Sequence, residues 1–289
     1  MRSLFATLRA AGTAVVFLTG HVTAVSTPAR MAEATRVVGA LFPAADAYTK
    51  RVALGRAAQL GCGGNAAPPF VYRPGAIGCA VDSSLTYGEF DLLFFATLTN
   101  EAFTRGGRSP EGQTFVDVGS GCGRLVFAAA ALWPSLARCV GIEMVESLHA
   151  LAVDAAPRAS TLIAEESVAS DIRGDRRAAA AVQLIREDAL QGLAAVADGK
   201  PVCAFAYSSA YASIGITLTD FSLACSGLPA GSRVVTIDKL LAVDDPCLEG
   251  TTLLLTLEGP NAETGGTSLG YVWEIGEGRQ ESAAGSERR

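Results

Sequence analysis

The sequence predicts an α/β fold: a doubly wound, mostly parallel seven-stranded sheet with a C-terminal antiparallel hairpin, preceded by a helical N-terminal segment. Two observations predict this fold. From residue 114 onward, apolar runs of strand length alternate with helical patterns, which is typical of a parallel sheet covered by helices. The last two strand-like runs have no helical pattern between them, and such a pair favours a hairpin.

The composition excludes several classes of protein. The chain has 289 residues, of which 49% are hydrophobic and 18% charged, so it is too apolar to be disordered and long enough for a proper core. Its net charge of −6 argues against strong nucleic-acid binding by overall charge. The seven cysteines never form a C-x-x-C pair, so no zinc site is predicted.

Residues 1–30 have the layout of a signal or transit segment. Arg2 and Arg9 precede a short apolar run, small residues follow it, and the first acid is Glu33. A plain N-terminal helix is the alternative. We expect an organelle (plastid or mitochondrion) or the secretory route if this segment is an address, and the nucleus or cytoplasm if translation starts at Met31. No stable membrane span is expected once the segment is removed.

The remaining chain divides into a helical leader and loop (31–84), a main domain (85–276) and a disordered tail (277–289). The leader is helical over 31–60, until a Gly- and Pro-rich stretch stops it. A polar segment at 158–178 is predicted to be a surface insertion. Further helices are expected over 91–103, 124–133, 145–156 and near 218–225, and strands over 114–118, 137–143, 179–186, 202–206, 232–237, 251–257 and 268–275.

The strongest chemical signal follows the first strand. Asp117 ends the apolar run, and Gly119, Gly121 and Gly123 then alternate with other residues before a helix begins. Glycines let the backbone turn tightly and approach a ligand, and a helix start offers free N–H groups. This spacing differs from the G-x-G-x-x-G of dinucleotide enzymes. Asp117 would repel a pyrophosphate but suits an ammonium or sulfonium group.

Two further acids complete a predicted cofactor site. Glu143 ends the second strand, where an acid binds both hydroxyls of a ribose. Asp188 follows the third strand and can accept a hydrogen bond from an adenine amine. The site therefore suits a molecule with an amino acid, a ribose and an adenine but no phosphates, and S-adenosyl-L-methionine fits that description.

The stretch from Leu85 to Leu240 resembles the seven-strand, Rossmann-like, S-adenosylmethionine-dependent methyltransferases. It is most similar to the non-SET histone-lysine methyltransferases of the disruptor-of-telomeric-silencing family, through 86–89, 115–124 and 140–143. The resemblance implies that the tyrosine–glycine–glutamate loop closes over the cofactor. The cofactor-binding residues expected on this basis are Tyr87, Gly88, Glu89, Phe90, Asp117, Gly119, Ser120, Gly121, Cys122, Gly123, Arg124, Glu143, Asp188 and Ala189.

The segment after the fourth strand departs from the family. The family has an asparagine pair and then an aromatic pair lining a lysine channel, whereas this chain has Ser208 and Ser209 between aromatic residues. Lysine-rich segments that would bind a nucleosome are not visible. We expect Tyr207 and Tyr211 to form the channel walls and Ser208 to accept a hydrogen bond from the amine.

The predicted function is methyl transfer to a protein lysine amine by in-line displacement, with a protein or small-molecule acceptor as partner. An organellar methyltransferase acting on a small molecule or a non-histone protein is the alternative, and the altered serine pair favours it. A non-catalytic cofactor-binding module and a nicotinamide-dependent oxidoreductase remain as further alternatives, although the glycine spacing argues against the latter. The acceptor, the degree of methylation, the oligomeric state and the true start codon do not follow from the sequence.

Overall fold

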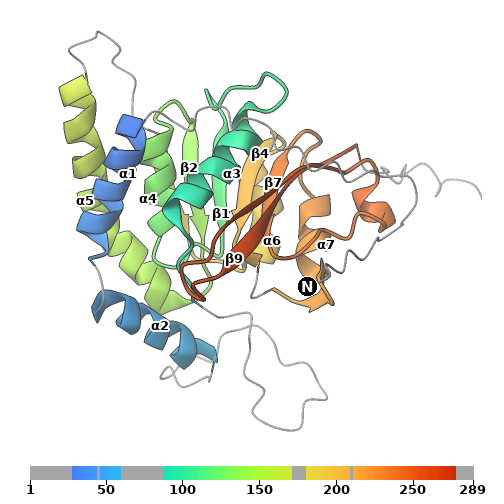
Figure 1. Cartoon of the computed structure of the whole chain (residues 1–289), viewed down its shortest axis with the longest axis horizontal. Helices are drawn as coiled ribbons and strands as arrows, with labels where there is room; N and C mark the ends of the chain where they lie inside the picture. Colours follow the sequence, from blue (N-terminus) through green and yellow to red (C-terminus); the bar gives the residue numbers. More distant parts are fainter. Residues whose placement is uncertain (1–27, 44–45, 60–86, 171–179, 209–210, 278–289) are drawn as a thin grey trace, which may run out of the picture.

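A computed structural model describes residues 28–43, 46–59, 87–170, 180–208 and 211–277 (Figure 1). Residues 1–27 of the predicted address segment, the Gly- and Pro-rich loop of the leader and nearly all of the tail lie outside these residues. Within them, no helix combines the length and the apolar character that crossing a membrane requires.

A seven-stranded sheet forms the centre of the molecule, as the sequence predicts. Its spatial order is β3-β2-β1-β4-β7-β9-β8, and every neighbouring pair is parallel except the two that involve β9. The strands are β1 Thr114–Val118, β2 Arg138–Ile142, β3 Ala181–Ile185, β4 Val202–Ala206, β7 Arg233–Ile237, β8 Thr252–Pro260 and β9 Thr267–Glu274. The chain winds outward from β1 to β3 and then returns to β4, so β1 and β4 flank the switch point where ligands bind in such sheets.

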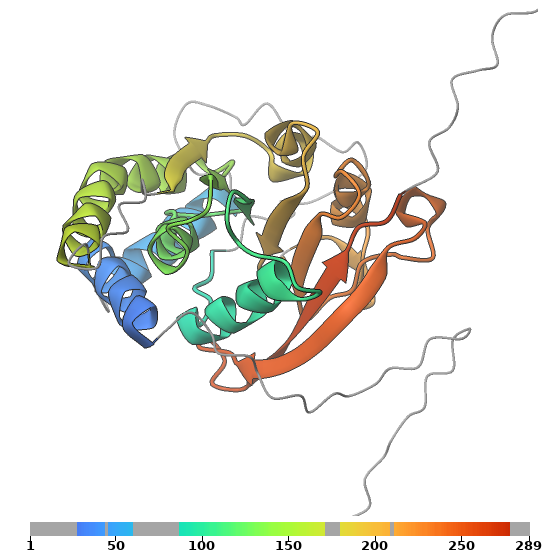
Figure 2. The same cartoon turned by 90° about the horizontal axis from the view of Figure 1, so that it is seen from above.

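Helices cover both faces of the sheet (Figure 2). One face packs against α1, α3, α4 and α5, and the other against α6 and α7. The helices are α1 Pro28–Leu41, α2 Asp46–Gln59, α3 Leu92–Thr104, α4 Arg124–Leu132, α5 Glu146–Ser170, α6 Ala189–Ala197 and α7 Asp220–Ser226, with a 3₁₀ turn, η4, at Pro246–Leu248. A two-stranded ribbon of β5 Ser213–Ile214 and β6 Thr217–Leu218 precedes α7.

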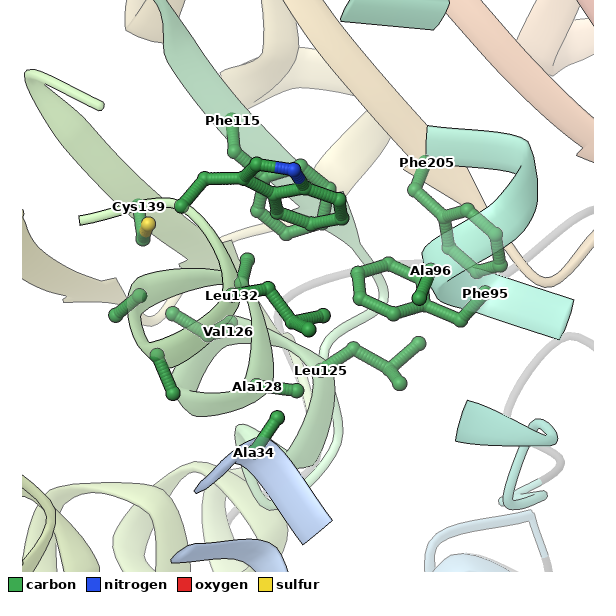
Figure 3. Packing of buried hydrophobic residues seen from close by; sticks show 14 of the residues in the cluster. Ala34, Phe95, Ala96, Phe115, Leu125, Val126, Ala128, Leu132, Cys139 and Phe205 are labelled. Carbon is green, nitrogen blue, oxygen red and sulfur yellow. The ribbon is translucent and has the colours of Figure 1, made fainter. Parts of the chain in front are cut away.

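Alternation along the strands explains this layering. Phe115 and Phe205 face the α3–α4 side, whereas their neighbours Val116 and Ala206 face α6 and α7. On the first side, the ring of Phe95 from α3 lies edge-on to Phe205, with centroids 5.1 Å apart, and Figure 3 shows the two side chains next to each other. This aromatic packing holds α3, and therefore the segment that precedes it, over the carboxyl end of β4.

The helical leader is not one continuous helix. It consists of α1 and α2, separated around Pro43, because proline lacks the N–H that would continue the helix. Its first helix begins at Pro28, inside the segment predicted as an address, and packs against α4 and α5. The division of the chain into leader and main domain stays a prediction.

The surface insertion predicted at 158–178 is wrong for residues 158–170. These residues extend α5 past Pro157, an internal proline that normally favours a helix end. The extension is stabilised because Ala159 and Ile163 are buried in the core. The Arg36 guanidinium of α1 also donates to the Leu162 carbonyl at 3.1 Å. The short helix α6 and the ribbon β5–β6 were not predicted.

Candidate active site

The glycine loop, Gly119–Gly123, connects β1 to α4 as the sequence predicts. The backbone N–H groups of Gly119 and Ser120 both donate to the Ile142 carbonyl at 2.9 Å, which fixes the loop to the end of β2. Gly121 and Gly123 have φ values of 54° and 82°, a region that side-chain-bearing residues rarely adopt. No side chain caps the start of α4, so its first N–H groups are not satisfied by a capping side chain.

Glu143 lies beside the glycine loop, and its carboxylate holds two backbone segments together. One oxygen accepts the Gly121 N–H and the other accepts the Val145 N–H, both at 2.7 Å. The residue is buried, which raises the pKa of its carboxyl, while the backbone N–H groups act in the opposite direction. Each carboxylate oxygen has a second lone pair, so Glu143 retains the capacity to accept ribose hydroxyls.

Asp117 is the second buried acid at the end of β1. It is 4% exposed, and burial together with the nearby Glu143 carboxylate raises the pKa of its carboxyl to about 8. Within the described ranges, neither a cation nor a hydrogen bond is among the causes that shift its pKa. Two adjacent buried acids without a cation form a site that favours a positively charged ligand.

Asp188 and Ala189 lie at the carboxyl end of β3, as predicted, but Asp188 also caps α6. Its Oδ1 accepts the Leu190 N–H at 2.9 Å, and its Oδ2 lies 3.4 Å from the Gln191 amide nitrogen. The predicted contact between Asp188 and an adenine amine stays a prediction. Ala189 is buried and belongs to the core beneath α6.

Tyr87–Phe90, here called the closing loop, covers the glycine loop. A Cβ added at Gly121 would lie 2.7 Å from the Tyr87 ring, so only glycine permits this approach. Phe90 anchors the loop in the core, with the centroid of its ring 5.3 Å from that of Phe205.

Polar contacts also connect the closing loop to the glycine loop and to α4. Arg124, at the start of α4, donates to the Phe90 carbonyl at 2.8 Å and lies 3.5 Å from the Glu89 carboxylate. The Cys122 thiol of the glycine loop is 3.2 Å from the Tyr87 hydroxyl.

The three residues predicted at the acceptor side point in different directions. Tyr207 packs its ring against Phe90, with centroids 5.2 Å apart, and is half-buried. Ser208 is completely buried, and its hydroxyl donates to the Ile237 carbonyl and accepts the Ile237 N–H. The Ser208 hydroxyl therefore joins β4 to β7, and its predicted contact with an amine stays a prediction.

Tyr211 lies on the cofactor side rather than beside Tyr207. Its hydroxyl donates to the Val118 carbonyl at 3.0 Å and would be 3.0 Å from a Cβ at Gly119. The pKa of Tyr211 is raised by burial and then by the carboxylates of Glu143, Asp117 and Asp188. Tyr211 is thus close to all three acids predicted to bind the cofactor.

Sequence reasoning missed two residues that contact the closing loop and a third that contacts one of these two. Arg51 of α2 forms an ion pair with Glu89, and Glu263 in the β8–β9 turn accepts the Glu89 N–H at 2.8 Å. Tyr48 of α2 lies 3.3 Å from the Glu263 carboxylate. No local pattern marks these residues, because their positions depend on how distant elements pack. In the parts of the chain that the structure describes, no three His, Cys, Asp or Glu side chains are grouped so that they could hold a metal ion.

Comparisons with known proteins give one family match and several matches to solved structures. Residues 80–164 match the family described as histone methylation protein DOT1. The rRNA methyltransferase aviRa from Streptomyces viridochromogenes is 14% identical, over 65% of this chain and 86% of that one, with a TM-score of 0.44. The tRNA methyltransferase TrmK of B. subtilis is 15% identical, over 63% and 65% of the two chains, with a TM-score of 0.42. No curated protein has a significantly similar sequence.

The strand order gives a mostly parallel, seven-stranded sheet with helices around it, which is consistent with a Rossmann-like methyltransferase fold. A DOT1-like resemblance covers less than a third of the chain and includes β1, β2 and the glycine loop. S-adenosylmethionine is the cofactor that this family implies. The buried Asp117 beside the Glu143 carboxylate, next to a loop where glycines allow close approach, fits its cationic amino-acid end.

Proposed function

We propose that this protein is an S-adenosylmethionine-dependent methyltransferase that transfers a methyl group to a lysine amine of a protein. One observation carries the cofactor assignment: a glycine loop flanked by two buried acids, Asp117 and Glu143, of which Asp117 has no cationic partner in the described part of the chain. The DOT1-like match supports the lysine acceptor.

We assign each of these residues to the part of the cofactor that matches its chemistry. Asp117 would hold the ammonium group of the cofactor, Glu143 its ribose hydroxyls, and the glycine loop its methionine end. When bound, S-adenosylmethionine supplies a methyl group already activated by a sulfonium charge. The protein therefore needs to align the acceptor and exclude water, and no covalent enzyme intermediate is required.

A lysine acceptor must lose a proton before it can react. With an ordinary pKa of about 10.4, only about 0.1% of a lysine amine is neutral near pH 7.4, which corresponds to about 4 kcal/mol. Apolar and aromatic walls lower this cost because they disfavour the ammonium form. Phe90 and the half-buried ring of Tyr207, which pack against each other, are the residues that we assign to such a wall.

A second candidate is an organellar methyltransferase for a small molecule or a non-histone protein. Ser208 favours it, because the hydroxyl at the family's amide position is bonded to Ile237 rather than free to face a lysine channel. The acidic net charge of −6 also offers little attraction to nucleosomal DNA. Localising a tagged full-length chain separates these readings: a nuclear signal supports the histone substrate, and a plastid, mitochondrial or secretory signal contradicts it.

Transfer of a tritiated methyl group tests the function itself. Purified protein is incubated with labelled S-adenosylmethionine and, in parallel, nucleosomes, free histones, total RNA, or soluble protein and small molecules from a cell lysate. A Glu143→Gln variant gives the background. Label on protein that survives hydrolysis as methyl-lysine supports the proposal. Label on RNA or small molecules alone contradicts the lysine acceptor, and cofactor binding without label in any fraction indicates a non-catalytic module.

A further inference from the structure

The closing loop is held from outside the sheet-and-helix core, and the contact comes from the N-terminal helical leader. We infer that Arg51 of α2 is a positioning residue that keeps Tyr87 and Glu89 over the glycine loop and thereby sets the affinity for the cofactor. This inference rests on the proposed function, because it concerns the same cofactor site. Residue 51 lies outside the segment that matches the DOT1 family.

Arg51 is a buried cation whose hydrogen bonds all go to the closing loop. The residue is 4% exposed, and its Nε donates to the Glu89 carboxylate at 2.8 Å and to the Tyr87 hydroxyl at 3.1 Å. Its Nη2 also pairs with Glu89. The guanidinium lies over the Phe42 ring, 5.6 Å from the ring centroid. A buried charge is tolerated only when it is paired, so α2 and the closing loop stabilise each other.

Tyr87 connects this ion pair to the glycine loop. Its hydroxyl donates to Glu89 at 2.9 Å, and its ring packs against Gly121. Burial raises the pKa of Tyr87, with the nearby Cys122 and Glu89 acting in the same direction, so the hydroxyl stays protonated and keeps its donor. One side chain, Tyr87, therefore separates Arg51 from the loop that we assign to the methionine end of the cofactor.

A second contact holds the closing loop from the opposite element. The Glu263 carboxylate, in the turn between β8 and β9, accepts the Glu89 N–H and lies where a side chain at Gly88 would be. Tyr48 of α2 reaches the same carboxylate at 3.3 Å. The leader and the β8–β9 turn thus meet over the closing loop. Glu263 fixes the backbone of Glu89, while Arg51 fixes its side chain.

Arg51 is expected to change cofactor affinity more than turnover, because its own hydrogen bonds go to Tyr87 and Glu89, whereas Tyr207 is reached only indirectly, through Glu89 and Glu263. The test uses the full-length protein with Arg51→Met, Arg51→Lys and, as a matched control, Lys50→Met at an exposed position of the same helix. The Kd for S-adenosylmethionine and for S-adenosylhomocysteine is measured by calorimetry, and the cofactor KM and kcat by methyl transfer.

For Arg51→Met we expect the Kd and the KM of the cofactor to rise about tenfold or more, with kcat at saturating cofactor changed less than about threefold. Arg51→Lys keeps the charge but loses the planar guanidinium group, so we expect the Kd and the KM of the cofactor to rise by an intermediate factor of about three. Lys50→Met should behave as wild type. An exchanged pair, Arg51→Glu with Glu89→Arg, should bind the cofactor more tightly than Arg51→Glu alone.

The possible results distinguish a failure of the role inferred for Arg51 from a failure of the proposed function. Unchanged cofactor affinity in both Arg51 variants overturns the inference, and so does a fall in kcat with KM unaltered. If Arg51→Met does not fold, Arg51→Lys and the exchanged pair still decide it, because a structural role alone would not move KM without kcat. Failure of the wild-type protein to bind either cofactor form would instead contradict the proposed function.

Discussion

Replacing Asp117 by asparagine perturbs a buried acid of the proposed cofactor site. The pKa of its carboxyl rises from an ordinary 3.8 to about 8, first because it is buried and second because Glu143 is near. Between these two pH values, the folded protein keeps a proton that the unfolded chain has lost. Unfolding therefore releases a proton, and this carboxyl makes the ligand-free fold less stable as the pH rises.

The size of the effect follows from the two pKa values. One proton per molecule corresponds to a loss of about 1.4 kcal/mol of unfolding free energy for each pH unit. Over the whole interval this reaches about 6 kcal/mol, an upper limit because a real interior relaxes around a charge. Asp117→Asn removes this contribution. The variant should therefore gain stability relative to wild type between pH 5 and pH 7.5, and its stability should depend less on pH.

Urea unfolding at several pH values measures this difference directly. If the unfolding free energy changed with pH by the same amount in wild type and in Asp117→Asn, the reasoning would be refuted.

A bound ammonium group has the opposite effect on the pKa of Asp117. It favours the ionised carboxylate and therefore lowers that pKa. With a pKa of about 8, S-adenosylmethionine binding at pH 7 should release about 0.9 proton from this group. Calorimetry in buffers of different ionisation enthalpy should detect that release in wild type but not in Asp117→Asn.

Two other substitutions test the packing of the site. Gly121→Ala places a methyl group 2.7 Å from the Tyr87 ring and should weaken cofactor binding in a calorimetric titration by about tenfold or more. Gly112→Ala, which has a similar positive φ but open space around it, is the control and should lose only about 1 kcal/mol of stability. Ser208→Ala leaves the Ile237 backbone groups without their buried partner and should cost about 1–3 kcal/mol in chemical denaturation. Wild-type stability in that variant would show that the serine does not join the two strands.

The parts of the fold that sequence predicts well are those specified locally. The bounds of β1 and β4 agree residue for residue. Gly119 directly follows β1 and Pro201 directly precedes β4, and strands avoid both residue types. The predicted hairpin forms, and the glycine loop lies between β1 and α4. The α5 extension was missed because Pro157 is a local signal for a helix end, whereas the burial of Ile163 that sustains the helix is a tertiary effect.

The candidate site likewise contains residues that local sequence patterns predict and residues whose positions depend on tertiary packing. Asp117 lies at the carboxyl end of β1 and Glu143 directly follows the neighbouring parallel strand β2, so pattern alone predicts that they are neighbours. Glu89 and Glu263 are 174 positions apart, and their contact depends on the register of the hairpin and the packing of α3. Arg51 is one of several basic residues in its helix, and its burial follows from how α2 packs against the closing loop. The ring of Tyr211 packs against Phe221 of α7, with centroids 5.2 Å apart, and this tertiary contact has no local sequence signal.

The most direct test of the site is a titration that compares a cationic nucleoside with phosphate-bearing ones. Wild-type protein and Glu143→Ala are titrated with S-adenosylmethionine, NADH and ATP in the same buffer. The two buried acids predict saturable binding of S-adenosylmethionine, at least tenfold weaker binding by the variant, and no detectable binding of NADH or ATP. Tighter binding of a phosphate-bearing ligand, or equal affinity for S-adenosylmethionine in both proteins, would contradict a cofactor site between Asp117 and Glu143.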